Sequence, residues 1–156
     1  MEQHKEIIEA FYEAFQRGDY QTMQGLYARE SSFHDPVFQD LSGYEAGKMW
    51  EMLLKRSKDL KISLGKIEGT DTGGTAVWIA TYTFGKKRRP IRNKIRANME
   101  IRDGQIVRHR DEFDLRHWMN QALGWSGKWL GWIPVYRKQV QKKAQESLKK
   151  YIAKTS

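Results

Sequence analysis

Two short stretches of the chain place ionisable side chains inside runs that otherwise alternate like half-buried strands. The first is Ser32–Val37 and the second is His109–Leu115. A carboxylate on the apolar face of a sheet is costly unless it is paired, hydrated or used in chemistry. The two stretches therefore predict a single pocket closed by tertiary structure.

Strand parity selects the side chains that would face this pocket. The residues that share a face are Phe33, Asp35 and Val37 in the first run, and Val107, His109, Asp111 and Phe113 in the second. If the apolar members point inward, Asp35, His109 and Asp111 do so too. A histidine beside two acids suits general acid–base catalysis, with Asp111 or Asp35 as the base and His109 as a relay.

Both acids also have a structural interpretation. Asp35 could form a turn with Pro36, and Asp111 could pair with Arg108 or Arg110 at a strand end. The sequence leaves these alternatives open.

The other residues expected in the pocket are mainly aromatic, and they are Tyr12, His34, Trp50, Trp78, Tyr82 and Phe113. The aromatic side chains would equally suit a packed core. His34 lies one residue off the inward parity, so it would reach the pocket only if a bulge re-aimed the strand. The spacing around His34 and His109 matches no metal motif, and the chain has no glycine-rich phosphate loop, so we expect neither a metal nor a cofactor.

Length and composition indicate one folded domain. The chain has 156 residues, of which 39% are hydrophobic and 12% aromatic, which is enough for a real core. It has no cysteine, which excludes disulfides, thiolate nucleophiles and cysteine-ligated zinc. No apolar run approaches the roughly 20 residues that span a bilayer, and the first residues lack a signal-peptide pattern. We therefore expect a cytoplasmic protein.

The net charge of +9 is unevenly distributed. Residues 1–84 hold 9 Lys and Arg against 13 Asp and Glu, whereas residues 85–156 hold 19 against 6. Such a charge run is typical of a solvated sheet face and tail helix, although it could also bind an acidic partner. The aromatic residues are not interleaved with these charges, so base stacking on nucleic acid is not indicated.

The hydrophobic period predicts helices first and strands afterwards. Helices are expected at residues 4–17, at a short segment capped by Asp19 that includes Met23, Leu26 and Tyr27, after the capping box Ser42–Glu45, and at 114–123. Strands are expected at 32–37, 60–68, 76–84, 91–101 and 105–113. This order predicts an α+β fold with helices on one side of a curled, mostly antiparallel sheet.

The C-terminal segment 124–156 is expected to extend the domain formed by residues 1–123. Residues 124–133 place three Trp among three Gly, and Pro134 suits the first turn of a final helix. The apolar stripe of that helix is Tyr136, Val140, Ala144, Leu148 and Ile152. A basic amphipathic helix can contact a membrane surface, but such a stripe more often packs on its own domain or on a second subunit.

The order of elements, together with Ile8–Asp19, Phe33–Val37 and Asp103–Val107, resembles the nuclear transport factor 2-like superfamily. This group includes ketosteroid isomerases, SnoaL-like polyketide cyclases and limonene epoxide hydrolase, and the likeness covers about residues 4–123. It implies a cone-shaped domain in which a curved sheet wraps the N-terminal helices and encloses a pocket. It also implies a homodimer formed through the outer sheet face.

The isomerase pattern and the hydrolase pattern each carry over only in part. By resemblance to the isomerases, Asp35 is the proton-shuttling carboxylate, but their oxyanion tyrosine falls on Phe11 beside Tyr12 and their protonated acid falls near Ala97. The closing run of the epoxide hydrolase matches Arg110–Leu115, which implies that Asp111 activates water.

Two further positions limit the carry-over. The Arg and Asp that partner the catalytic acid in the epoxide hydrolase would fall around Trp78 and Ala80, which cannot replace them. The acid of the cyclases aligns with either Asp111 or Asp114. The resemblance thus implies a cofactor-free isomerase, cyclase or hydrolase that binds a mostly apolar small molecule. The alternative is a non-catalytic dimeric module whose basic sheet face and tail contact an acidic partner or a membrane surface.

Overall fold

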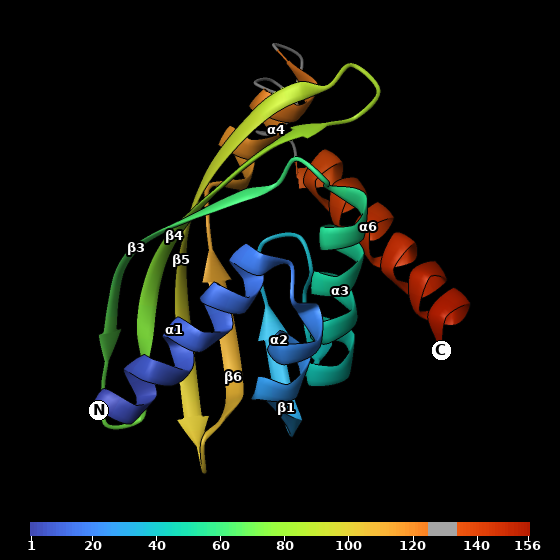
Figure 1. Ribbon diagram of the computed structural model, residues 1–156. Coiled ribbons are helices and arrows are strands. Elements are labelled where there is room, and N and C mark those ends of the chain that lie inside the picture. The colour runs from blue at the N-terminus through green and yellow to red at the C-terminus, as the bar shows by residue number, and fades with distance from the viewer. Residues whose placement is uncertain (125–133) are drawn as a thin grey trace.

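The computed structural model describes residues 1–124 and 134–156 and contains one six-stranded sheet covered by helices (Figure 1). The strands are β1 (Tyr27–His34), β2 (Leu41–Ser42), β3 (Lys61–Gly69), β4 (Gly73–Phe84), β5 (Arg89–Arg102) and β6 (Gln105–Glu112). The helices are α1 (Glu2–Arg17), α2 (Tyr20–Leu26), α3 (Gly43–Arg56), α4 (Leu115–Leu123) and α6 (Pro134–Thr155). The strand order is β2-β1-β6-β5-β4-β3.

Helix α1 lies across the sheet and supplies much of the core (Figure 1). Its stripe of Ile8, Phe11 and Phe15 is buried, as the helical spacing predicts. The helix ends at Gly18, whose φ of 73° is left-handed and suits glycine. The side chain of Asp19 then accepts a hydrogen bond from the Thr22 backbone N–H at 3.1 Å and caps α2.

The sheet follows the predicted alternation most clearly in β5. The inward side chains are buried, and they are Ile91, Asn93, Ile95, Ala97, Met99 and Ile101. Asp103 and Gly104 form the two-residue turn into β6. All neighbouring strands pair antiparallel except β1 and β6, which run parallel. The mostly antiparallel α+β fold is therefore confirmed.

The segment around β1 differs from the prediction in two ways. Tyr27, expected on the second helix, is instead the first residue of β1. The strand ends at His34 and not at Val37, because the Asp35 side chain accepts hydrogen bonds from the Val37 and Phe38 backbone N–H groups at 2.7 and 2.5 Å. This turn is the structural alternative for Asp35, and it means that strand parity does not determine where Asp35 points.

Helix α6 runs antiparallel to α3 and packs its apolar stripe on the domain (Figure 1). Leu148 is 2% exposed within the core. The Tyr151 hydroxyl donates to the buried carboxylate of Glu51 at 2.6 Å, and Arg56 Nη1 donates to Ser147 Oγ at 2.6 Å. The stripe therefore packs on its own subunit. The Trp and Gly residues of 125–133 lie outside the described part of the chain.

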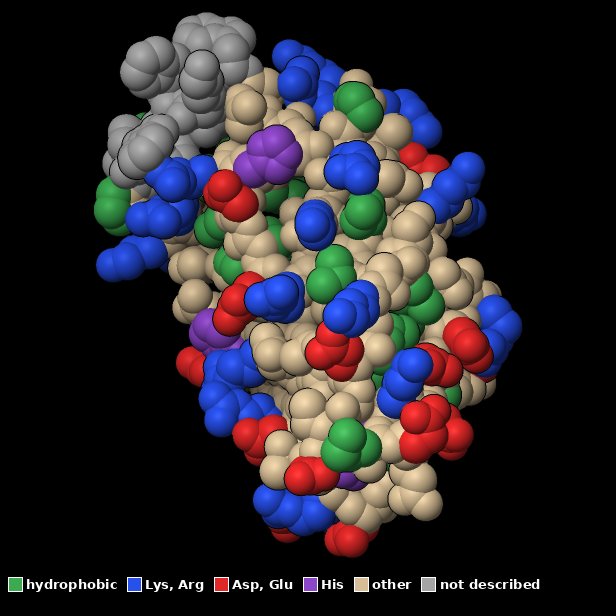
Figure 2. All heavy atoms as spheres, turned by 90° about the vertical axis from the view of Figure 1, so that its left-hand side faces the viewer, with side chains coloured by type: hydrophobic (Ala, Val, Ile, Leu, Met, Phe, Trp, Pro, Cys, Tyr) green, Lys and Arg blue, Asp and Glu red, His purple; other side chains and the backbone are tan. Residues whose placement is uncertain are grey.

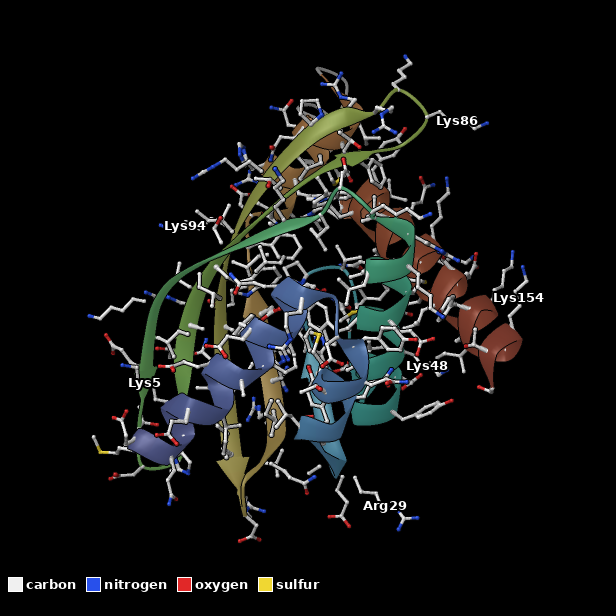
Figure 3. All side chains as sticks on the ribbon, viewed as in Figure 1. Lys5, Arg29, Lys48, Lys86, Lys94 and Lys154 are labelled. Atoms are coloured by element: carbon white, nitrogen blue, oxygen red, sulfur yellow. The ribbon has the colours of Figure 1, made fainter. Side chains whose placement is uncertain are left out.

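The convex face of the sheet carries charges of both signs (Figure 2). On β5 the exposed side chains include Arg92, Lys94 and Arg96, with Glu100 further along the same face. The side chain of Lys94 projects away from the body of the molecule (Figure 3). Among the described residues no helix is long and apolar enough to cross a bilayer.

Candidate functional site

A cavity of about 840 Å³ lies between the concave face of the sheet and the helices α3, α4 and α6. Its inner wall is apolar and aromatic and includes Phe15, Trp50, Trp78 and Ile95, all of which are buried. Its outer wall includes Phe84 and Tyr136, which are 38% and 37% exposed. The cavity therefore has a closed end, which is lined by buried residues, and an open end, which is lined by exposed residues. We call the open end the mouth.

At the closed end, a row of hydrogen bonds connects three elements. Trp50 Nε1 on α3 donates to the Tyr27 hydroxyl at 2.9 Å. That hydroxyl lies 2.7 Å from His109 Nδ1, and His109 Nε2 lies 2.8 Å from Asp111 Oδ1. His109 is completely buried, and the rings of Phe11 and Phe33 contact it edge-on.

The chemistry of the donor groups limits which atom donates in each hydrogen bond of this row. An indole N–H can only donate, so the Tyr27 oxygen accepts from Trp50 and its own proton is free to go to His109 Nδ1. A neutral His109 then carries its proton on Nε2 and donates it to Asp111. Burial raises the pKa of Tyr27 well above its usual value, against the lowering effect of the Trp50 hydrogen bond. The phenol therefore stays protonated and can donate to His109 Nδ1.

Asp111 leaves one carboxylate oxygen for a ligand. Oδ1 is used by His109, whereas Oδ2 accepts no hydrogen bond from the described residues. Asp111 is 4% exposed and lines the cavity. Arg108 pairs with Glu100 at 3.7 Å, so the expected alternative in which Arg108 pairs with Asp111 is not what the structure has.

Asp35 lies in the same cavity but in different surroundings. It is 8% exposed, and its Oδ1 is fixed by the two backbone N–H groups of its turn. Burial raises the pKa of Asp35 from 3.8 to about 7, and the nearby charge of Asp111 adds to the rise. At the closed end, Asp35 is thus about half protonated at pH 7, and Asp111 beside it is hydrogen-bonded to His109.

Most residues expected at the site are brought together. Those that line the cavity are Asp35, Asp111, Trp50, Trp78, Tyr82 and Phe113. His109 lies behind Asp111 and touches the cavity only through it. Tyr82 accepts a hydrogen bond from Trp118 Nε1 at 2.7 Å, which fixes two aromatic rings of the outer wall.

Tyr12 and His34, which were expected to line the pocket, lie outside its lining. Tyr12 is fully buried in the core against Trp78, with ring centroids 5.7 Å apart, and its hydroxyl has no hydrogen-bond partner in the described part of the chain. His34 keeps its off-parity direction because the register of β1 against β6 is regular from Ser32 to His34, and its Nδ1 lies 3.4 Å from Asp40 Oδ1. Asp114, the alternative to Asp111, caps α4 by accepting from the His117 backbone N–H at 3.2 Å.

The prediction missed several polar residues of the site, among them Arg56, which lines the cavity from the end of α3. Tyr27 was not identified because the second helix was expected to continue through it. Asn93 is 7% exposed and lines the cavity, and a polar residue in the apolar parity class of β5 was a usable signal. Lys143 lines the cavity from α6, and no local pattern indicates where a tail helix will pack.

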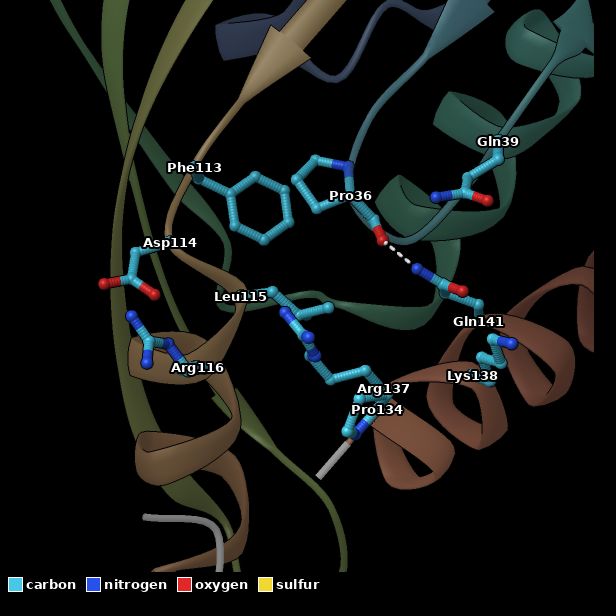
Figure 4. Close-up of a pocket in the computed structure, with 10 residues that line it drawn as sticks. All are labelled: Pro36, Gln39, Phe113, Asp114, Leu115, Arg116, Pro134, Arg137, Lys138 and Gln141. Atoms are coloured by element: carbon cyan, nitrogen blue, oxygen red, sulfur yellow. Dashed lines mark hydrogen bonds between the residues drawn. The ribbon is translucent and has the colours of Figure 1, made fainter. Parts of the chain in front are cut away.

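A second, smaller hollow of about 500 Å³ lies between the starts of α4 and α6 (Figure 4). It shares Phe113 with the main cavity and includes Asp114, Arg116 and Arg137. Gln141 Nε2 donates across it to the Pro36 carbonyl at 2.9 Å (Figure 4). This bond connects α6 to the turn that carries Asp35. Within the described residues, no group of His, Asp and Glu side chains has the geometry to hold a metal ion.

Comparison with known proteins places this geometry in a family. The model of the SnoaL-like domain matches residues 8–109, which is well over half of the chain. A search of the curated proteins finds no match.

Solved structures share the fold. IdmH, a candidate polyketide cyclase from Streptomyces antibioticus, is 21% identical with a TM-score of 0.63, and the alignment covers 76% of this chain and 96% of IdmH. A candidate polyketide cyclase from Xanthomonas campestris is 24% identical, with a TM-score of 0.60 and coverage of 77% and 96%. A hypothetical protein with a ketosteroid isomerase-like fold from Catenulispora acidiphila is 15% identical, with a TM-score of 0.65 and coverage of 75% and 92%. At these identities the likeness shows the fold.

Proposed function

This chain belongs to the SnoaL-like domain family, and on that premise we propose that it is a cofactor-free acid–base enzyme acting on an apolar carbonyl compound. Asp111 is the base, His109 positions it, and Asp35 is the acid. The reaction is proton transfer at the carbon next to a carbonyl, followed by isomerisation or by ring closure within the same substrate.

The observation that carries the proposal is the contrast between the two carboxyl groups in one apolar cavity. Asp111 is hydrogen-bonded to His109 and presents a free Oδ2, whereas the pKa of Asp35 is raised to about 7 by burial. A carboxyl group that keeps its proton up to about pH 7 can act as the acid beside a second carboxyl group that acts as the base.

Each proposed step is balanced in protons and electrons. Asp111 Oδ2 takes the proton from the carbon, and the electron pair moves into the carbonyl group to give an enolate. The protonated Asp35 donates a hydrogen bond to the enolate oxygen, where charge develops. Asp111 then returns its proton, either to another carbon of the substrate or to the alkoxide that forms when the enolate carbon attacks a second carbonyl.

Proton exchange tests this chemistry without knowledge of the natural substrate. We expect the protein to accelerate exchange of the acidic C–H protons of 2-tetralone in deuterated water, followed by proton NMR. Asp111→Asn should slow the catalysed exchange by about 10² to 10⁴-fold, the usual contribution of a positioned base. The fold should persist, because an amide oxygen can still accept from His109 Nε2.

Asp114→Asn is the matched control for that measurement. Asparagine remains a good N-cap for α4, so this variant removes a neighbouring carboxylate without disturbing the helix. We expect its exchange rate to equal that of the wild type. Wild-type exchange no faster than buffer, or equal exchange by Asp111→Asn and wild type, would contradict the proposal.

A second candidate function rests on the convex face of the sheet. Arg92, Lys94 and Arg96 are exposed there in one row, which is the surface a non-catalytic module would offer to an acidic partner. The same face also carries Glu68 and Glu100, so its charge is mixed. This mixture favours the catalytic proposal over the binding module.

A further inference from the structure

Among the described residues, four charged side chains line the main cavity, and the acidic and basic ones lie at different depths. Asp35 and Asp111 are buried at the closed end. Arg56 and Lys143 are exposed at the mouth. The cavity is therefore negative where the chemistry is proposed and positive where a ligand enters.

The two cations lie on the same side of the mouth. Arg56 is the last residue of α3, and its Nη1 donates to Ser147 Oγ on α6 at 2.6 Å. Lys143 precedes Ser147 by four residues, so it lies on the same face of α6 and about 6 Å along the helix axis. Because α6 runs antiparallel to α3, this step carries Lys143 beyond the end of α3 and over the cavity.

Neither cation is neutralised by the described residues. Arg56 Nη1 is bonded to a neutral hydroxyl and its guanidinium lies 5.7 Å from the Tyr151 ring centroid, but it makes no ion pair in residues 1–124 and 134–156. Lys143 likewise has no carboxylate within ion-pair distance in those ranges. Two unpaired cations at the edge of an apolar cavity are suited to hold an organic anion.

The strand register gives the length of the cavity wall along which the body of a ligand would lie. Asp111 pairs with Ala97 on β5, and Ile91, opposite Tyr82, lies six residues nearer the mouth. Six residues of strand span about 20 Å. The wall between these levels includes Trp78, Ala80 and Asn93, so it offers mostly apolar contacts together with the amide of Asn93.

We propose that the substrate is an amphipathic carboxylic acid with a body of several rings. Its carboxylate is held by Arg56 and Lys143 at the mouth, and its reacting carbonyl end lies at Asp111. This inference rests on the proposed function, which decides that the reacting end of the substrate lies at Asp111. Its physical reason is that a carboxylate is attracted to the mouth and repelled from Asp111, so only one orientation is favoured.

A pair of fluorescent probes tests this ligand class. 1-Pyrenebutyrate and 1-pyrenebutanol share a polycyclic body and differ in the anionic group, and both accept energy from excited tryptophan. Trp50, Trp78 and Trp118 line the cavity and act as donors. We expect the wild type to bind the acid about tenfold more tightly than the alcohol, as for one charge-assisted hydrogen bond in a partly shielded site.

Lys143→Met should lower that preference from about tenfold to about threefold, because Arg56 remains, and should leave binding of the alcohol unchanged. Lys142→Met is the matched control, because Lys142 is exposed on the same helix and does not line the cavity. It should keep the preference of the wild type. Equal binding of acid and alcohol by the wild type, no binding of either probe, or equal effects of the two lysine substitutions would each overturn the inference.

The two proposals fail separately. Asp111→Asn removes the base but leaves both cations, so it should keep the preference for the acid while losing proton exchange. A protein that exchanges protons without preferring the acid would overturn only the inference about the ligand. A protein that prefers the acid without accelerating exchange would overturn only the proposed reaction.

Discussion

Asp35 and Asp111 have the same side chain but different hydrogen-bond partners, and only Asp35 lies in a backbone turn. Asp35 gains two backbone hydrogen bonds, but burial is the larger effect and raises its pKa to about 7. The raised pKa also makes the stability of the fold depend on pH, because the folded protein holds this proton more tightly than the unfolded chain does.

Ionisation of Asp35 therefore costs stability as the pH rises from about 4 to 7. Above that window the cost reaches up to about 4 kcal/mol, from 1.36 kcal/mol for each pKa unit. Asp35→Asn keeps an oxygen that accepts from Val37 and Phe38 but cannot ionise. We expect its free energy of unfolding in urea to exceed that of the wild type near pH 8.5 and to match it near pH 4.

Asp40→Asn is the control for this pH dependence, since the Asp40 side chain is 86% exposed in the same loop. Its stability should follow the wild type across the window. If Asp35→Asn gave no relative gain at high pH, the carboxyl group would be ionised without cost, and the proposed role of Asp35 as an acid would fail.

At the scale of elements, α6 supplies the wall of the cavity that the sheet and the other helices leave open. Val140, Lys143 and Ala144 supply one wall, and Leu148, one turn further along, enters the core. The helix is held by side-chain bonds to α3 and by Gln141 to the turn of Asp35. Its contribution to stability is thus concentrated at Leu148.

Leu148→Ala should lower the free energy of unfolding by about 2 to 4 kcal/mol, because it leaves a void among buried side chains. Val135→Ala on the same helix is the control, since Val135 is 54% exposed, and it should change stability by less than about 0.5 kcal/mol. Urea denaturation measures both. Equal, small effects would indicate that α6 does not pack on the domain in solution.

Elements with strong local signals could be predicted, and contacts between distant segments could not. The alternation of β5, the capping box at Ser42 and the turn at Asp103–Gly104 each follow from local chemistry. The bond between Tyr27 and His109 joins residues 82 apart in sequence, and no short-range pattern specifies it. Asp35 reaches the cavity by a turn, so the parity argument named the residue for the wrong physical reason.

At the scale of the whole molecule, the uneven charge of the sequence does not make the convex face of the sheet purely basic, because acidic side chains lie there too. Basic and acidic side chains lie beside one another on this face (Figure 2). Arg108 pairs with Glu100 at 3.7 Å. A mixed surface attracts a polyanion only weakly, since repulsion offsets part of the attraction. The homodimer expected from the family resemblance stays a prediction.

We expect the protein to elute from immobilised heparin below physiological ionic strength, where screening already weakens exposed charges. A variant with Arg92, Lys94 and Arg96 replaced by serine should elute only slightly earlier. Retention of the wild type well above physiological salt, lost in the triple variant, would instead support the binding-module function.

The end of α6 has a practical consequence for assays. Lys48 Nζ donates to Thr155 Oγ1 at 3.1 Å, and Tyr44 lies 3.0 Å from Ser156, so the last residues lie beside the first turns of α3. Arg56, at the other end of α3, is about 18 Å away along the helix axis. A surface or affinity tag attached through Ser156 therefore keeps clear of the route by which molecules enter, and sensor-chip capture at that end suits kinetic measurements on small compounds.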